Sequence, residues 1–473
     1  MTFSYSTLHS NCSNSVVSSQ LTERHLHIIW LEQKYISSFF THQSEEIEVI
    51  SPGIWNFDAG PDFLKAHIRI GQTEYKGDIE IHLHDKDWFL HQHHLDSRYN
   101  EVVLHISYYQ PKNRKWINKE NGFQIDSFYL EKQLKGSLEE LISTIDLELY
   151  PSRKYPGKGV CADKLFKNLS ESTVRSFLKS AAYWRLENKL NFFENQFLNS
   201  ADQLAAGLAM ALGYKNNATA FLELFNYLMP LKDEPEEELL AMALGSCGFL
   251  EENRKAIWEL SDHYQYLKLV WNGKKYQMLH QTHLQLHQIR PLNHPIRRIA
   301  YLVKFIRETN IEQFWKDSLD LWKQFVENEI NQKQLKNHFF ELIPQYSFSY
   351  WDHHFTFELK ASLKRLPTIG EEFKMHVLLN TFLPLIYGLV RKNHLKHEWE
   401  KLQSFYISLK VKKTGKILYL QHRFWGENNK QFLNEAQSVQ GMNQLHRDFC
   451  MHHESSCQGC PFVERFLKIK EFQ

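Results

Sequence analysis

The alternation of apolar and polar positions divides the chain into an amino-terminal part with strand-like runs and a longer part with helical periodicity. In the first part, residues 21–36 (LTERHLHIIWLEQKYI) have apolar residues at helical spacing, and Thr22 is placed to cap that helix. Short β-type runs follow between residues 45 and 84, and residues 101–109 (EVVLHISYY) supply another strand. One helix, three closely spaced strands, a connecting segment and a further strand predict an α/β or α+β module.

The remaining chain is mainly helical in its pattern. Helical spacing dominates residues 170–345, where one helix is expected to begin near Pro295, a residue type favoured in the first turn. Another helix is expected over residues 371–404. Residues 405–424 (FYISLKVKKTGKILYLQHRF) alternate around Thr414-Gly415, which is typical of a β-hairpin.

These patterns predict an α+β protein with several domains, as its length of 473 residues also favours. Residues 1–20, rich in Ser, Thr and Asn, are expected to be a disordered leader. An α/β module with a mixed sheet would occupy residues 21–150 and a helical domain residues 151–345. Residues 346–473 would hold helices, the small β-hairpin and a carboxy-terminal cysteine knuckle.

Composition changes this picture little. A net charge of +1 gives no overall attraction to nucleic acid or to a membrane, so any such contact must come from local patches. The longest apolar stretch, Met375 to Val390, is short for a bilayer and contains Asn380 and Pro384, so a buried helix is expected. The first residues lack the basic and apolar segments of a signal peptide. A cytoplasmic location without membrane contact is therefore expected.

The most informative segment runs from Lys76 to Asp85. Because side chains on a strand alternate between its faces, Asp78, Glu80, His82 and His84 would share one face. Two acids and two imidazoles in a row are suited to holding a divalent cation. A plain solvated strand face is the alternative.

A turn, Asp58-Ala-Gly-Pro-Asp62, comes before the neighbouring strand. If the two strands pair as a hairpin, Asp62 and Glu80 approach each other. Converging carboxylates repel unless a cation or a proton lies between them, and a divalent cation there could polarise a phosphoryl oxygen. The alternative is that Asp62 serves only the turn.

The segment Gly60-Pro61-Asp62, followed eighteen residues later by Glu80, Ile81 and His82, resembles the signature of the PD-(D/E)XK nuclease superfamily. That signature is an Asp after a Pro, a short hairpin and then Glu-x-Lys, and the predicted order of elements is also similar to the core of that fold. The resemblance implies a nuclease in which Asp62 and Glu80 bind Mg²⁺ or Mn²⁺.

The resemblance also implies that a helix acid, Glu23 or Glu32, assists the metal. The departure from the signature is His82, which stands where lysine is usual. An imidazole could orient or deprotonate the attacking water, or bind the metal itself. It could also favour Mn²⁺ or Zn²⁺ over Mg²⁺, since imidazole suits softer ions.

More imidazoles follow the acid–histidine strand. His91 and His94 would share a helix face if that segment is helical, and Tyr99 and His105 lie further on. These groups, with His84, could complete a metal site or contact a phosphate. A polar loop with structural histidines is the alternative.

The chain as a whole resembles an uncharacterised bacterial family, domain of unknown function 2851. The resemblance is carried by PGIWNFDAGPDFLKAHIRIG, GDIEIHLHDKDWFLHQHHLD, VVLHISYY, RPLNHPIRRIAYLV, YWDHHF and the terminal cysteines. It implies kinship and no established activity.

Cys450, Cys457 and Cys460 form a cluster near His446 at the carboxy terminus. A C-x-x-C pair places two thiolates on one turn, as tetrahedral Zn²⁺ requires, so a zinc knuckle completed by a histidine is expected. Reduced free thiols are the alternative. The spacing also resembles the iron–sulfur loop of endonuclease III-type glycosylases, but Phe466 occupies the position of its fourth cysteine, which disfavours such a cluster.

Local basic groups are the candidates for contact with a nucleic-acid backbone. They are Lys112, Arg114, Lys115, Arg290, Arg297, Lys412 and Lys413. Ordinary ion pairing or solubility is the alternative role for each. The sequence therefore favours a metal-dependent nuclease with nucleic acid as its partner. A non-catalytic nucleic-acid-binding scaffold and a metal-dependent hydrolase of a small molecule stay open.

Overall fold

The computed structural model of the protein divides into two compact units, which are described separately. The sheet unit comprises residues 6–156 and 446–473, and the helical unit comprises residues 157–445 together with the first five residues. The structure describes residues 5–10, 21–112, 116–145, 147, 150, 157–251, 255–274, 282, 284–286, 289, 291–426, 431–452, 457 and 460–471. The helical unit has no division near residue 345, and the cysteine-containing end of the chain belongs to the sheet unit.

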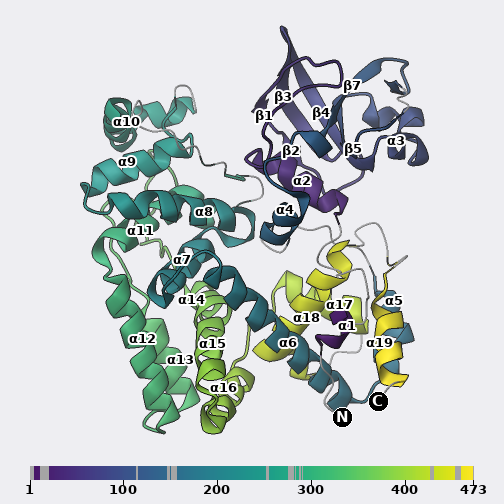
Figure 1. The fold of residues 1–473 in the computed structure, drawn as a ribbon. Helices are drawn as coiled ribbons and strands as arrows, with labels where there is room; N and C mark the ends of the chain where they lie inside the picture. Colours follow the sequence, from purple (N-terminus) through teal and green to yellow (C-terminus); the bar gives the residue numbers. More distant parts are fainter. Residues whose placement is uncertain are drawn as a thin grey trace. The chain divides into compact units, whose positions relative to one another are not determined.

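The sheet unit is built on one seven-stranded mixed sheet (Figure 1). Its strands are β1 (Ile47–Ser51), β2 (Ile54–Trp55), β3 (Phe63–Ile70), β4 (Thr73–His84), β5 (Val102–Tyr109), β6 (Ile117–Asn118) and β7 (Gln124–Tyr129). The order is β1-β3-β4-β5-β7-β6, with β2 paired to β3. The first strands are antiparallel, whereas β4, β5 and β7 run parallel to one another. This confirms the predicted α+β class and the mixed sheet.

The predicted hairpin of β3 and β4 is present. Its two-residue turn begins at Gly71, whose φ of +57° suits a turn that requires left-handed backbone. The register pairs Phe63 with Ile79. A β-bulge follows at Lys65, which has φ +57° and donates its backbone N–H to Asp78 Oδ1 at 3.0 Å. The side chain of Asp78 thus stabilises the bulge by accepting a backbone N–H that the strand pairing leaves free.

One face of the sheet shares its apolar core with helix α2 (Glu23–Glu32), the helix predicted after Thr22. Leu26, Ile29 and Trp30 of this helix are buried in the same cluster as Ile79 and Ile81 of β4. Short helical segments lie on the chain between β4 and β5: α3 (Asp87–Leu90), η1 (His93–Leu95) and η2 (Ser97–Tyr99). The other helical segments of this unit are α1 (Thr7–Ser10), η3 (Leu130–Lys132), α4 (Leu138–Thr144), η12 (Cys450–His452) and α19 (Phe462–Glu471).

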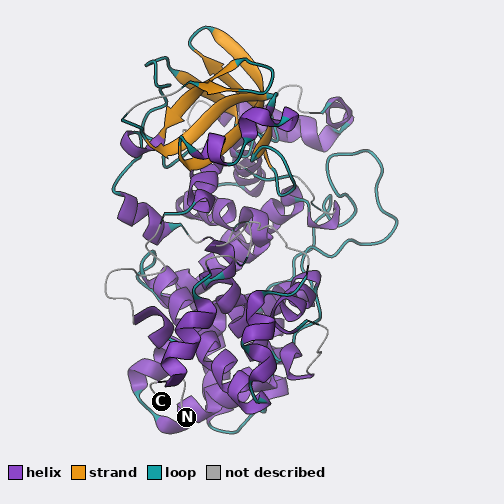
Figure 2. Ribbon diagram, turned by 90° about the vertical axis from the view of Figure 1, so that its right-hand side faces the viewer, coloured by secondary structure: helices purple, strands orange, loops and turns teal. Residues whose placement is uncertain are grey.

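The helical unit contains no strand among its described residues (Figure 2). Its α-helices are α5 (Val160–Lys164), α6 (Glu171–Glu194), α7 (Ser200–Leu212), α8 (Tyr214–Leu228), α9 (Glu236–Ser246), α10 (Asp262–Lys274), α11 (Pro295–Glu308), α12 (Ile311–Val326), α13 (Gln332–Leu342), α14 (Glu371–Val377), α15 (Leu383–Asn393), α16 (Lys396–Ser408), α17 (Gly415–Trp425) and α18 (Ala436–Asp448), whose end lies in the sheet unit. A π-helical turn, Leu378–Phe382, joins α14 to α15. This continuous stretch, Glu371–Asn393, is the one candidate for a membrane span among the described residues, and 72% of its apolar window is buried inside the protein. Such burial is usual for a core helix.

Two expectations about the fold are wrong. The segment expected to form a β-hairpin, residues 405–424, instead contains the end of α16, a connection over residues 409–414 and most of α17. Thr414 caps α17 by accepting the backbone N–H of Ile417. The expected disordered leader contains α1, and Tyr5 and Leu8 are buried. The remainder of the leader, residues 1–4 and 11–20, lies outside the described residues.

Candidate metal-binding site

The hairpin brings the two predicted carboxylates together. Because Phe63 pairs with Ile79, Asp62 lies opposite Glu80. The backbone N–H of Asp62 donates to Glu80 Oε2 at 3.1 Å, and Asp62 Oδ2 accepts the N–H of Ile81 at 3.0 Å. His27 of α2 also reaches this point, with its Nε2 3.1 Å from Asp62 Oδ2.

The two acids lie close together, and Glu80 is removed from water. Glu80 is 5% exposed, and burial, followed by the charge of Asp62, raises its pKa well above the usual value. Glu23, at the start of α2, has its pKa raised to about 7, mainly by burial, with the charges of Asp62 and Asp87 adding to the shift. Three carboxyl groups therefore share one region, where a cation would relieve their mutual repulsion.

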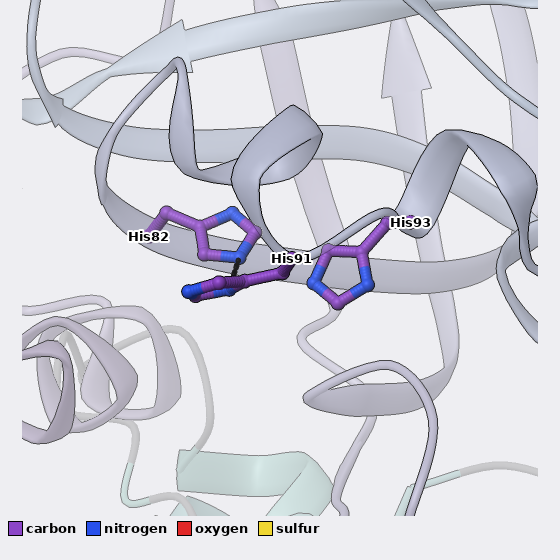
Figure 3. Close-up of side chains that lie close together, drawn as sticks. All are labelled: His82, His91 and His93. Carbon is purple, nitrogen blue, oxygen red and sulfur yellow. Dashed lines mark hydrogen bonds between the residues drawn. The ribbon is translucent and has the colours of Figure 1, made fainter.

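Three imidazoles lie close together (Figure 3), and two of them contact Glu80. His82, His91 and His93 each offer a ring nitrogen, and these atoms all lie within 4.8 Å of one another. Glu80 Oε1 is 3.2 Å from His93 Nε2 and 3.4 Å from His82 Nε2. His82 Nε2 lies 3.2 Å from His91 Nδ1, the contact dashed in Figure 3. His82 and His93 are buried, whereas His91 is exposed and gives the cluster an opening to solvent.

A polar chain lies behind His82. The imidazole of His105, on β5, is fully buried, and its Nε2 is 2.9 Å from His82 Nδ1. On its other side, His105 Nδ1 is 3.4 Å from Asp85 Oδ1, which also accepts the hydroxyl of Tyr129 at 3.3 Å. The sequence Asp85–His105–His82 thus connects a buried carboxylate to the ring that faces Glu80.

Aromatic rings fix the orientation of these imidazoles. His93 stacks on Tyr99 with ring centroids 3.9 Å apart, and the buried ring of Trp88 meets the edges of both His93 and His105. Burial is also the main cause that lowers the pKa of His93 to about 4 and the pKa of His82 well below its usual value. Both rings are therefore neutral at pH 7 and can offer lone pairs.

Three predicted ligands lie elsewhere. His84 is exposed and stacks on Tyr109, because it stands at the end of β4. His94 packs against Phe89 with tilted rings, and the left-handed conformation of Gln92 (φ +61°) comes directly before His93, which does lie in the cluster. Glu32 pairs with Lys34 and accepts the Tyr150 hydroxyl. These residues do not contribute to the group around Glu80.

Sequence reasoning missed His27 and Asp85, and it named His93 only within the histidine-rich segment that could complete a metal site, without choosing it as a ligand. His27 interrupts the buried face of α2, so a histidine at an apolar position of the helix was the available signal. His93 was adjacent to the histidines that the sequence singled out, but its selection depends on the backbone at Gln92. Asp85 gave no signal beyond its place at the end of the strand.

The basic candidates divide into three groups. Arg297 is wrong as a nucleic-acid contact: it is fully buried and donates to the carbonyl oxygens of Trp351, Leu292, Pro367 and Leu366. Lys112 and Lys413 are exposed, and Lys412 is exposed but pairs with Glu372 at 3.0 Å. Arg114, Lys115 and Arg290 lie outside the described residues.

The predicted carboxy-terminal site is only partly described. Cys450 lies in η12, and the backbone N–H of Cys460 donates to the carbonyl oxygen of Cys457 at 3.3 Å. All three cysteines are partly exposed, and His446, on α18, is buried. Zinc at these cysteines stays a prediction.

Comparison with known proteins identifies the family of the chain. A family model described as "Protein of unknown function (DUF2851)" matches residues 23–414, which is most of the chain. The chain belongs to the DUF2851 family. Within this DUF2851 protein, the matched segment includes the acids, the imidazole cluster and most of the helical unit. No curated protein matches the chain, and no solved structure matches it.

Proposed function

We propose that this DUF2851 protein is a metal-dependent hydrolase of phosphodiester bonds, with nucleic acid as its substrate class. The observation that carries the proposal is the juxtaposition of Asp62 and Glu80 across the β3–β4 hairpin, with Glu23 of α2 near enough for the charge of Asp62 to raise its pKa. The resemblance to PD-(D/E)XK nucleases, in which two such acids hold a metal, supports the proposal. Of the two helix acids that the resemblance offers, we propose Glu23, since Glu32 accepts a hydrogen bond from the Tyr150 hydroxyl.

The donor set suits a divalent cation. Carboxylate oxygens of Asp62 and Glu80 would hold it. The buried Nε2 of His93 lies 3.2 Å from Glu80 Oε1 and has no hydrogen-bond partner in the described part of the chain. When bound, such an ion supplies charge that polarises a phosphoryl oxygen and lowers the pKa of a water molecule.

The remaining chemistry is hydrolysis. Water adds its oxygen to phosphorus, the ester P–O bond breaks, and the leaving oxygen takes up a proton, which yields a phosphomonoester and a hydroxyl group. His82 occupies the position of the superfamily's lysine but offers a neutral ring, since burial lowers its pKa. It can therefore accept a proton or bind an ion through Nε2, which a lysine ammonium cannot do, because the ammonium has no lone pair. The aromatic contacts keep the neighbouring rings from rotating.

The test is a cleavage assay with the full chain. Supercoiled plasmid, single-stranded DNA and RNA are incubated with Mg²⁺, Mn²⁺ or Zn²⁺, and with EDTA as the ion-free control. We expect ion-dependent cutting that Glu80→Gln and Asp62→Asn reduce by about 100-fold or more, in line with the loss of a group that stabilises transition-state charge. Glu46→Gln, at an exposed acid of the same unit, is the matched control and should retain activity.

Three other outcomes contradict the proposal. Nucleic-acid binding without turnover in every ion would indicate a scaffold. Cleavage of a small phosphodiester such as bis(p-nitrophenyl) phosphate, but of no nucleic acid, would indicate a small-molecule hydrolase. Cutting that survives in both acid variants would indicate a contaminating nuclease.

A further inference from the structure

The histidines beside Glu80 are more numerous than a pair of acidic metal ligands requires. Their spacing suits direct coordination. In a tetrahedral zinc site with bonds of 2.0–2.1 Å, neighbouring ligand atoms are about 3.3 Å apart. The contacts of Glu80 Oε1 with His93 Nε2 and His82 Nε2 are 3.2 and 3.4 Å, and His82 Nε2 is 3.2 Å from His91 Nδ1. We propose that His82, His91, His93 and Glu80 form a site for a borderline transition ion of the Zn²⁺ or Co²⁺ class.

The charge of Asp85 and one hydrogen bond set the tautomers along the buried chain and support this assignment. The Asp85 carboxylate lies 3.4 Å from His105 Nδ1 without the alignment of a hydrogen bond, and its negative charge favours the tautomer of His105 with its proton on that nitrogen. The Nε2 lone pair of His105 then accepts the Nδ1–H of His82 at 2.9 Å. The remaining nitrogen of His82, Nε2, therefore carries a lone pair.

With this proton placement, His82 Nε2 faces Glu80 Oε1 at 3.4 Å and also lies 3.2 Å from His91 Nδ1. His93 Nε2 lies 3.2 Å from the same oxygen of Glu80 but is not aligned for a hydrogen bond, and it has no hydrogen-bond partner among the described residues. A buried acceptor without a donor is costly, and binding a cation would remove that cost. The Glu80 oxygen and the two histidine nitrogens thus lie at distances that suit the ligands of one cation.

The donor set also selects the class of ion. Neutral imidazoles suit Zn²⁺, Co²⁺ and similar ions, whereas Mg²⁺ prefers oxygen ligands and retains several waters. Asp85 and His105 act as positioning residues, because a carboxylate and a second imidazole hold His82 in the tautomer that an ion needs. The exposed ring of His91 provides the route by which the ion enters.

The inference rests on the proposed function for the use of the ion, but ion binding is measurable without a substrate. The full chain, stripped of metal with EDTA and dialysed, is titrated with CoCl₂ while the visible absorption of four-coordinate Co²⁺ is recorded. A chain carrying Cys457→Ser and Cys460→Ser serves as the background, so that thiolate ligation at the carboxy terminus does not contribute. The variants are His82→Gln, His93→Gln and Asp85→Asn, and circular dichroism establishes that each is folded.

The matched controls are His84→Gln and His94→Gln, each next to the cluster in sequence but outside it in the structure. We expect one Co²⁺ per chain, displaced by Zn²⁺ and not by a large excess of Mg²⁺. Asp85→Asn should weaken binding by about 10- to 100-fold, the usual effect of losing an outer partner of a histidine ligand, and loss of His82 or His93 should weaken it further. Both controls should bind as the background does.

Equal Co²⁺ affinity in His82→Gln, His93→Gln and the background would overturn the inference, as would four-coordinate absorption that disappears in the controls. A full-length chain that cleaves nucleic acid with Mg²⁺ but binds no Co²⁺ would leave the proposed function standing and refute the histidine site. Co²⁺ binding without any cleavage of nucleic acid would support the histidine site and refute the proposed function.

Discussion

Replacing Glu80 with glutamine should make the ion-free protein more stable and remove its response to metal. Glu80 lies opposite Asp62 on paired strands, where opposite Cβ atoms are typically about 5 Å apart. Two charges at about 5 Å and an effective dielectric of about 20 repel by about 3 kcal/mol. Partial protonation of Glu80, whose pKa is raised, reduces this cost, so about 1–3 kcal/mol of stabilisation is expected. The glutamine oxygen can still accept the backbone N–H of Asp62.

The assay is thermal unfolding of the full chain, followed by tryptophan fluorescence, in EDTA and in Co²⁺ or Mn²⁺. In EDTA, Glu80→Gln should raise the midpoint of the sheet unit by about 2–4 °C per kcal/mol. At about 100 times the dissociation constant, the ion should stabilise the wild-type protein by about 2.7 kcal/mol and leave the variant unmoved. Glu46→Gln, at an exposed acid, should behave as the wild type in both conditions. A variant that is destabilised in EDTA, or that the ion stabilises fully, would refute the reasoning.

Three further predictions concern positions outside the cluster. Gly77→Ala should destabilise the sheet unit by about 1–3 kcal/mol in urea unfolding, because the added Cβ would overlap the carbonyl oxygen of Glu101 and the side chain of Val103. An unchanged urea midpoint would contradict this close approach. Arg297→Lys should lower the unfolding free energy of the helical unit by about 2–4 kcal/mol, since several buried carbonyl oxygens lose their donor. It should leave the affinity for nucleic acid unchanged. Weakened nucleic-acid binding with normal stability would instead support the predicted role of Arg297 as a nucleic-acid contact. Burial lowers the pKa of His263 to about 4, so the folded state resists protonation. Its contribution to stability is therefore complete above pH 6.5 and is lost as pH falls from 6.5 toward 4, and His263→Phe should flatten this slope in urea midpoints measured between pH 8 and 4.

Much of the acid part of the site could be predicted because it depends on local rules. Strand alternation put Glu80 and His82 on one face, and a short turn between β3 and β4 fixed the register that brings Asp62 to Glu80. Strand alternation did not predict the role of Asp78, at the other end of the row of polar residues. Asp78 accepts the backbone N–H of Lys65 at a β-bulge, which no pattern of apolar positions reveals.

The imidazole cluster and the carboxy-terminal helices depended on information that the pattern did not contain. A single left-handed residue, Gln92, decides which of the neighbouring histidines turns inward. In residues 405–424, the alternation around Thr414 suggested a turn, yet the threonine hydroxyl caps a helix. Ile417, Leu420 and Phe424 then repeat at helical spacing and are buried. Capping and turn chemistry use the same residue types, so the two readings compete until packing decides between them.

The central claim, an ion held by Glu80 and the adjoining imidazoles, is tested most directly by anomalous diffraction from crystals of the full chain soaked in Co²⁺. We predict a peak about 2.0–2.2 Å from Glu80 Oε1, His82 Nε2 and a ring nitrogen of His93. No peak beside these atoms, or one confined to the carboxy-terminal cysteines, would contradict the account.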